Sequence, residues 1–212
     1  MKTLIAILSC HAHKEQDHVC RQTWVPAGGY RFFLGRDPNF GASGAAPLQD
    51  EEFLDVPDDY LGLPFKTQAA CRWALTHGYD FLFKCDNDTY VHVPRLLASG
   101  FEDRDYTGWD WEGHGGYCSG GAGYWLSRVA MQHIANATLI MDYADTTRGS
   151  LKGEDLQIGE VLRNQGITPN GDERYRLHLP GPEPGNDIIT LHDVRNPCKG
   201  QRMFDVHRSA NE

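Results

Sequence analysis

Two carboxylates one residue apart end an apolar run of the sequence. Residues 79–85 are YDFLFKC, and Asp86, Asn87 and Asp88 follow directly. Because residues two apart in an extended chain point to the same side, Asp86 and Asp88 can both face one cation. Hard oxygen ligands suit Mg²⁺ or Mn²⁺, and such sites often combine one or two carboxylates with substrate phosphates. The pair therefore predicts a divalent-metal site, with a polar strand end as the structural alternative.

Two other kinds of metal site do not explain this pair. An EF-hand calcium loop needs a third Asp or Asn at its fifth position and Gly at its sixth, where this sequence has Tyr90 and Val91. The six cysteines include no C-x-x-C pair and no spacing typical of zinc ligands. The sequence therefore favours an oxygen-rich site.

A glycine-rich segment is the second candidate for chemistry. Residues 117–127, YCSGGAGYWLS, contain Gly120, Gly121 and Gly123. Glycines let a backbone approach a ligand closely or adopt positive φ. The structural alternative is a tight turn before the helix predicted at residues 128–137.

Two acidic residues and a histidine complete the set of candidates. Glu154 and Asp155 begin a helix predicted to end at Gly166. Acidic residues there ordinarily complement the helix dipole, but an ionised carboxylate could also accept a proton from an attacking hydroxyl. His192 ends a short strand and could supply an imidazole to the same cation, although a lone histidine is usually only a satisfied polar residue.

Strands and helices that could position these residues alternate along the chain. Apolar strands are predicted at residues 3–9, 31–35 and 80–85, and the last is continuous enough to be buried on both faces. Helices are predicted around residues 15–24, at 65–78 with Gly78 as the C-terminal cap, and after Pro94. This alternation indicates an α/β fold with a mixed, mainly parallel sheet flanked by helices. In such sheets ligands bind at the carboxyl ends of the strands, where Asp86 and Asp88 lie.

Length, composition and charge restrict the functional classes. The chain has 212 residues, 40% of them hydrophobic and 11% aromatic, as in an ordinary globular protein. Its net charge of −9 argues against nucleic acid or an anionic membrane as a partner. The apolar stretch at residues 4–8 is shorter than the roughly 7–15 residues of a secretory leader, and no run reaches the ~18–20 of a membrane span.

The order of these segments resembles that of glycosyltransferase family 31, the β-1,3-glycosyltransferases that include Fringe and the β-1,3-galactosyltransferases. The match runs from about Leu4 to Arg195 through CRQTW, DDYLGLPFKT, FLFKCDNDTYV, YCSGGAGYWLS, EDLQIG and LHDVR. The D-x-D and S-G-G-x-G-Y elements together are specific to this family. The resemblance implies a GT-A (nucleotide-diphospho-sugar transferase) fold, with a single catalytic domain over residues 1–212.

The resemblance also implies a role for individual residues. Asp88 and Asp86 would hold the Mn²⁺ or Mg²⁺ of a UDP-sugar complex, Asp88 as the direct ligand, and His192 would complete the ligand set. Asp155 would be the catalytic base, with Glu154 the less favoured choice. Donor or acceptor contacts would come from Arg21, Lys66, Lys84, Asn87, Gly120, Gly121, Gly123 and Tyr124, with the glycines shaping the wall where sugar and acceptor meet.

The sequence departs from the family pattern in three respects. Asn87 replaces the middle acid of the D-D-D motif, at a position that faces away from the metal, so little loss is expected. The DDYLGLPFKT segment lacks the usual Asn-Leu-Thr. The chain begins at its first strand, whereas eukaryotic members carry an anchor and stem, so we expect a cytoplasmic protein, or a Golgi-type lumenal domain if the chain is trimmed.

Together these implications predict a metal-dependent inverting glycosyltransferase. It would move a hexose or N-acetylhexosamine from a UDP-sugar to a hydroxyl of a glycan, glycoconjugate or other acceptor, in a β-1,3-type linkage. One alternative is a non-catalytic nucleotide-sugar or glycan-binding module; another is a glycosyltransferase for hydroxylated DNA bases, which the negative charge disfavours. A phosphotransferase is disfavoured because the sequence has no G-x-x-x-x-G-K-[ST] loop.

Overall fold

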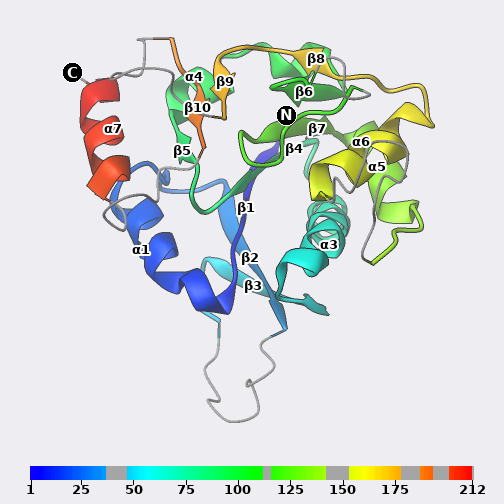
Figure 1. Ribbon diagram of the computed structural model, residues 1–212, viewed down its shortest axis with the longest axis horizontal. Helices are drawn as coiled ribbons and strands as arrows, with labels where there is room; N and C mark the ends of the chain where they lie inside the picture. The colour runs from blue at the N-terminus through cyan, green and yellow to red at the C-terminus, as the bar shows by residue number, and fades with distance from the viewer. Residues whose placement is uncertain (37–46, 112–115, 142–152, 178–186, 193–200, 212) are drawn as a thin grey trace.

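A central seven-stranded sheet organises the protein (Figure 1). The computed structural model describes residues 1–36, 47–111, 116–141, 153–177, 187–192 and 201–211. The strand order in the sheet is β3-β2-β1-β4-β7-β6-β8. These strands are β1 Thr3–Leu8, β2 Tyr30–Arg36, β3 Glu51–Pro57, β4 Phe81–Asp86, β6 Tyr106–Gly108, β7 Tyr124–Ser127 and β8 Asn170–Gly171. A three-stranded sheet of order β5-β10-β9 comprises β5 Tyr90–Val91, β9 Tyr175–Arg176 and β10 Thr190–Leu191.

The large sheet is mixed but mainly parallel, as the sequence pattern predicted. β1 pairs in parallel with β2 and β4, and β2 pairs in parallel with β3. Only β7 among these seven described strands runs against its neighbours, pairing antiparallel with both β4 and β6. The register pairs Leu8 of β1 with Asp86 of β4, so these two strands end side by side at one edge of the sheet.

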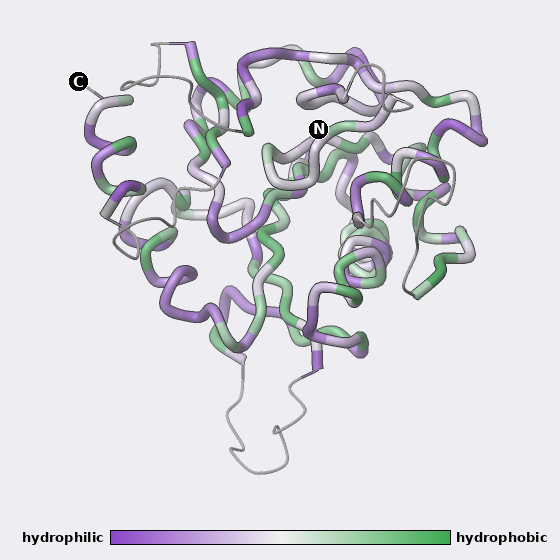
Figure 2. The backbone as a smooth tube through the Cα atoms, viewed as in Figure 1, coloured by the Kyte–Doolittle hydropathy of each residue, from purple (hydrophilic) through white to green (hydrophobic). Residues whose placement is uncertain are grey.

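Alternating side chains give the sheet two apolar faces. In β1, Ile5 and Ile7 enter one core cluster, whereas Leu4, Ala6 and Leu8 enter the other, as the period of two in a strand requires. Helices α1 Lys14–Gln22, α4 Val93–Leu97 and α7 Gln201–Asn211 contribute to the first cluster, and α3 Leu63–Thr76, α5 Arg128–Asn136 and α6 Glu154–Arg163 contribute to the second. The helices therefore cover both faces (Figure 1), and the apolar colours gather along the central strands (Figure 2).

Helix boundaries differ from the predicted ones by a few residues. α3 begins at Leu63, two residues earlier than predicted, because Pro64 fits the first turn of a helix. Gly78 follows its end with φ of +75°, which confirms the predicted role of this glycine at the helix terminus. α1 ends at Gln22, before Trp24, whose side chain packs in the core instead.

The structure also bears on membrane spans and on the late LHDVR segment. Within the described ranges, no helix combines the length and apolar character that a bilayer span needs. Residues 193–195 of the LHDVR segment lie outside the described residues, so only Leu191 and His192 of that segment have a place in the structure.

Candidate functional site

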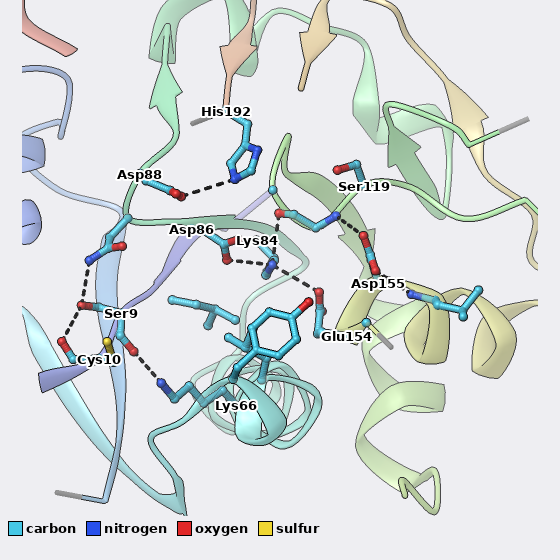
Figure 3. Close-up of a pocket in the computed structure, with 18 of the residues that line it drawn as sticks. Ser9, Cys10, Lys66, Lys84, Asp86, Asp88, Ser119, Glu154, Asp155 and His192 are labelled. Atoms are coloured by element: carbon cyan, nitrogen blue, oxygen red, sulfur yellow. Dashed lines mark hydrogen bonds and ion pairs between the residues drawn. The ribbon is translucent and has the colours of Figure 1, made fainter. Parts of the chain in front are cut away.

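A cavity of about 500 Å³ lies at the edge of the sheet where β1 and β4 end. Its size falls within the roughly 300–1,000 Å³ typical of ligand pockets. Residues 8–10 at the end of β1 and residues 86–88 at the end of β4 line one side. The glycine-rich residues 119–121 and the start of α6, residues 153–156, line the other (Figure 3). The cavity therefore joins the segments that the sequence analysis singled out.

Asp86, Asp88 and His192 come together in this cavity. One ligand atom from each lies within 4.8 Å of the others, and His192 Nε2 lies 3.6 Å from Asp88 Oδ1. The small sheet brings His192 close to Asp88, because Tyr90 of β5 pairs with Leu191 of β10. Figure 3 shows the imidazole facing the Asp88 carboxylate. Two carboxylates and one imidazole suit Mn²⁺ or Mg²⁺, so the donor set fits the predicted metal.

A tight turn separates the two aspartates. The Thr89 N–H donates to the Asp86 carbonyl at 3.1 Å, and the Asn87 N–H donates to the Leu8 carbonyl at 3.1 Å. The Thr89 hydroxyl donates to the Gly121 carbonyl at 2.7 Å, which ties the turn to the glycine-rich wall. The Asn87 amide points away from the aspartates, as predicted, and donates to Asp17 Oδ1 at 2.8 Å.

A buried lysine connects the metal-site acids to α6. Lys84 Nζ lies 2.9 Å from Asp86 Oδ1 and 3.2 Å from Glu154 Oε2, and it donates to the Gly120 carbonyl at 3.1 Å. Burial by itself lowers the pKa of Lys84, but Asp86 and Glu154 raise it above its usual value. The ammonium therefore remains charged, with two carboxylates and one carbonyl oxygen close to its nitrogen.

Glu154 is enclosed by its neighbours. Its Oε1 accepts hydrogen bonds from the Thr67 hydroxyl at 2.7 Å and from the Tyr124 hydroxyl, and the residue is only 6% exposed. Burial raises the pKa of Glu154, and Lys84 lowers it. Both carboxylate oxygens are thus engaged inside the protein.

Asp155 differs from Glu154 in its surroundings. Its Oδ2 accepts from the Gly120 N–H at 3.1 Å and its Oδ1 accepts from the Leu156 N–H at 2.9 Å, and it lines the cavity. A carboxylate offers about four acceptor positions, so two backbone donors leave capacity for another proton. It is the second residue of α6, in the first turn of the helix.

Close contacts explain two glycines of the S-G-G-x-G segment. A Cβ at Gly121 would lie 2.6 Å from His192 Cε1, so a side chain there would displace the imidazole. Gly123 has φ of +83°, and its Cβ would lie 2.5 Å from the Phe83 ring. The motif therefore lets the wall approach the metal-binding residues and the strand beneath them.

The structure places five of the eight predicted donor or acceptor residues on the cavity wall and three elsewhere. Those on the wall are Lys66, Lys84, Asn87, Gly120 and Gly121. Arg21, Gly123 and Tyr124 do not line it, so their positions do not support the predicted direct contact. The Arg21 guanidinium instead pairs with Asp50 at 2.7 Å and Glu51 at 3.1 Å at the start of β3, and Tyr124 is buried beneath the wall.

Several residues of the site were not predicted from the sequence. Asp58 accepts from the Gly35 N–H at 2.6 Å and the His11 N–H at 2.7 Å, and it pairs with Lys66 at 2.7 Å. It thereby joins the turn after β1, the strand β2 and the helix α3 at the cavity wall. Its position in the quoted DDYLGLPFKT segment was the available signal. Three aromatic residues also line the cavity, namely Tyr60, Trp111 and Tyr117. Tyr60 belongs to the same DDYLGLPFKT segment and Tyr117 to the glycine-rich segment, whereas Trp111 lies in no quoted segment.

Acidic groups predominate in the described lining of the cavity. Its two lysines are already paired, Lys66 with Asp58 and Lys84 with Asp86 and Glu154. Three other carboxylates, Asp59, Asp88 and Asp155, also line it. An anionic ligand entering here would meet repulsion unless a cation came with it.

Comparison with known proteins identifies similar sequences along nearly the whole chain. No model of a protein family matches the sequence. A mouse acetylgalactosaminyl-O-glycosyl-glycoprotein β-1,3-N-acetylglucosaminyltransferase is 25% identical over 98% of this chain and 61% of its own length. A human N-acetyllactosaminide β-1,3-N-acetylglucosaminyltransferase 4 is 25% identical over 97% of this chain and 61% of its own length. The chain thus spans about three fifths of these curated relatives.

Solved structures support the same fold. A glycosyltransferase involved in the glycosylation of the major capsid of PBCV-1 matches 96% of this chain and 98% of its own with a TM-score of 0.52 at 13% identity. The apo-form glycosyltransferase GlyE of Streptococcus pneumoniae matches 97% of this chain and 60% of its own with a TM-score of 0.51 at 11% identity. The resemblance predicted from the motifs is therefore confirmed: the chain has the GT-A fold and, along nearly its whole length, is similar to β-1,3-N-acetylglucosaminyltransferases.

Proposed function

We propose that this protein is a metal-dependent glycosyltransferase that moves a sugar from a UDP-sugar to an acceptor hydroxyl with inversion. The observation that carries the proposal is the meeting of Asp86, Asp88 and His192 in one cavity with Asp155. A cation site and a carboxylate free to accept a proton are the two protein groups that a direct displacement from a sugar diphosphate requires. The similarity to sugar-transferring enzymes supports the same conclusion.

Asp86, Asp88 and His192 would hold Mn²⁺ or Mg²⁺. The bound cation would offset the negative charge that builds on the departing diphosphate. The charge of the cavity supports this requirement, because both lining lysines are committed to carboxylates. A diphosphate entering alone would face Asp88 and Asp155 without a compensating cation from the described lining.

Asp155 would accept the proton of the acceptor hydroxyl. Two backbone N–H groups fix the orientation of its carboxylate, and the cavity gives the acceptor access to it. Glu154 is not suited to this role, since Lys84, Thr67 and Tyr124 enclose it. The acceptor oxygen would attack the anomeric carbon as the bond to UDP breaks, and this single displacement would give a β-linkage from an α-linked donor.

N-acetylglucosamine is the first sugar to test. The curated relatives named above transfer N-acetylglucosamine in β-1,3 linkages according to their names. A human chondroitin sulfate glucuronyltransferase, 27% identical over 61% of this chain, makes a glucuronyl donor the second choice. We propose an acceptor that carries a sugar hydroxyl, with a β-1,3-type product.

A screen for UDP release tests the proposal. The protein would be incubated with UDP-N-acetylglucosamine, UDP-glucuronic acid and other UDP-sugars, each with Mn²⁺ or with a chelator, and free UDP would be measured with and without saccharide acceptors. Metal-dependent release from one donor is expected, and Asp155→Asn should remove it. Tight UDP-sugar binding without any release, across donors and acceptors, would instead support a non-catalytic binding module.

A further inference from the structure

A buried carboxylate lies behind the D-N-D turn, on the side away from the cavity. Asp17 of α1 is 0% exposed. Its Oδ1 accepts from the Ser9 hydroxyl at 2.6 Å and from Asn87 Nδ2 at 2.8 Å. A buried carboxylate requires such donors, because removal from water without them is costly. Burial raises the pKa of Asp17 to about 6, while the hydrogen bonds from Ser9 and Asn87 lower it.

α1 holds Asn87 by its main chain as well as by its side chain. The Cys20 thiol donates to the Asn87 carbonyl at 3.0 Å, one helical turn after Asp17. Asn87 Nδ2 also approaches Ser9 Oγ at 3.2 Å and the His13 carbonyl at 3.3 Å. The neighbours of the Asn87 amide nitrogen are thus a carboxylate, a carbonyl and a hydroxyl, all of which can accept a hydrogen bond. This fixes the amide in one orientation.

We propose that Asp17 is a positioning residue for the metal site: by holding the Asn87 amide, it fixes the turn that presents Asp86 and Asp88 to one cation. This inference depends on the proposed function, because the effect it predicts is a change in the binding of a divalent cation together with UDP. Asp17 touches neither the cation nor the sugar nucleotide, and acts only through Asn87. The contact joins residues 70 positions apart in the sequence.

This arrangement reverses the expectation for the middle residue of the motif. Because the Asn87 side chain faces away from the metal ligands, its replacement by the acid of the family pattern was expected to cost little. In the structure, Asn87→Asp would replace the donor at 2.8 Å from Asp17 Oδ1 with a second carboxylate oxygen inside the protein. Two buried carboxylates at that separation repel, so the turn must move or one of them must take up a proton.

A paired substitution tests the coupling directly. Asn87→Asp and the double variant Asp17→Asn/Asn87→Asp carry the same residue at 87 and differ only at 17. The double variant restores one amide facing one carboxylate. Hydrogen exchange of the amides of residues 86–91, measured without metal, reports the order of the turn. The Mn²⁺ concentration at half-saturation of UDP binding reports the metal site.

Asn87→Asp should speed exchange in the turn and raise the Mn²⁺ requirement by about tenfold or more, the equivalent of a lost charge-assisted hydrogen bond. Asp17→Asn in the same chain should return both measurements to within about threefold of the wild-type values. Ile134→Ala in the remote core of α5 is the control, and should lower Tm without changing the Mn²⁺ requirement.

Two results would overturn the inference: exchange in the turn unaffected by Asn87→Asp, or no recovery in the double variant. A failure of the proposed function looks different. In that case hydrogen exchange in the turn would still rise in Asn87→Asp and recover in the double variant, but UDP binding by the wild-type protein would be independent of Mn²⁺.

Discussion

Lys84 and Glu154 form a buried ion pair at the wall of the cavity, with Lys84 Nζ 3.2 Å from Glu154 Oε2. The same ammonium lies 2.9 Å from Asp86 Oδ1. One cation therefore balances an acid of the metal site and the first acid of the E-D pair. This arrangement separates the roles of the two adjacent acids, since Lys84, Thr67 and Tyr124 enclose Glu154. Backbone N–H groups of Gly120 and Leu156 hold Asp155 instead.

Loss of the lysine should destabilise the fold strongly. Lys84→Met leaves Glu154 buried without its cation, and breaking one partner of a buried pair costs about 3–5 kcal/mol. The double variant Lys84→Met/Glu154→Gln should recover much of this loss, because the glutamine oxygen can still accept from Thr67 and Tyr124. Urea denaturation of the two variants checks the prediction. Equal stability of the single and double variants would show that the unpaired charge of Glu154 is not the cause of the lost stability.

The metal site should control UDP binding. Calorimetry with Mn²⁺ should detect UDP binding to the wild-type protein, and a chelator should remove it. Asp88→Asn keeps the size of the side chain but weakens the ligand, so affinity for UDP with Mn²⁺ should fall by more than about tenfold. Asp105→Asn, a change to an acid outside the cavity, is the matched control. Undiminished UDP affinity in the presence of chelator would contradict the metal assignment.

Local patterns were sufficient to predict much of the site. The apolar run before Asp86 predicted β4. Asp86 and Asp88 lie close together with His192, but a turn after β4, and not the extended chain assumed from their spacing, places them there. Gly120 and Gly121 of the glycine-rich segment line the cavity, and His192 lies beside Asp88. β4 follows from its apolar composition, and the motifs span only a few residues each, so a sequence displays both directly.

Local sequence patterns could not predict the contacts between distant segments. Arg21 was predicted to contact a ligand because of its motif, whereas Asp50 and Glu51 at the start of β3 are its partners. Asp17 had only a faint signal, a polar residue three positions before Cys20 on the buried side of α1. Its partner Asn87 is fixed by the packing of α1 against the end of β4. That packing is a property of the tertiary fold, so no local pattern could reveal it.

Stability should depend on pH through Asp17. Its pKa is raised from the ordinary value of 3.8 to about 6, so the folded state binds this proton more tightly than the unfolded state. The resulting stabilisation is fully present below the unfolded pKa and is lost as the pH rises through the folded one. At pH 7 the loss relative to acid pH corresponds to roughly 3 kcal/mol for a fully buried group.

Comparison with Asp17→Asn isolates this contribution. The asparagine oxygen can still accept from Ser9 and Asn87, but the side chain no longer titrates. The free energy of unfolding of the variant should therefore increase relative to that of the wild-type protein as the pH rises from about 4 to about 7. Urea denaturation at several pH values gives both curves. A constant difference between them would show that Asp17 does not titrate in this range.

Asp155 gives the sharpest separation of catalysis from structure. Asp155→Asn removes proton acceptance at the cavity and disturbs one of two backbone hydrogen bonds, a loss of about 1 kcal/mol in stability. Turnover should nevertheless fall on the order of 10²–10⁴-fold, while Mn²⁺-dependent UDP binding stays close to that of the wild-type protein because Asp86, Asp88 and His192 are intact. Glu154→Gln, at the enclosed neighbouring acid, should reduce turnover less. Steady-state UDP release and calorimetry on the two variants measure both effects, and an Asp155→Asn protein that kept more than about a tenth of its turnover would exclude Asp155 as the base.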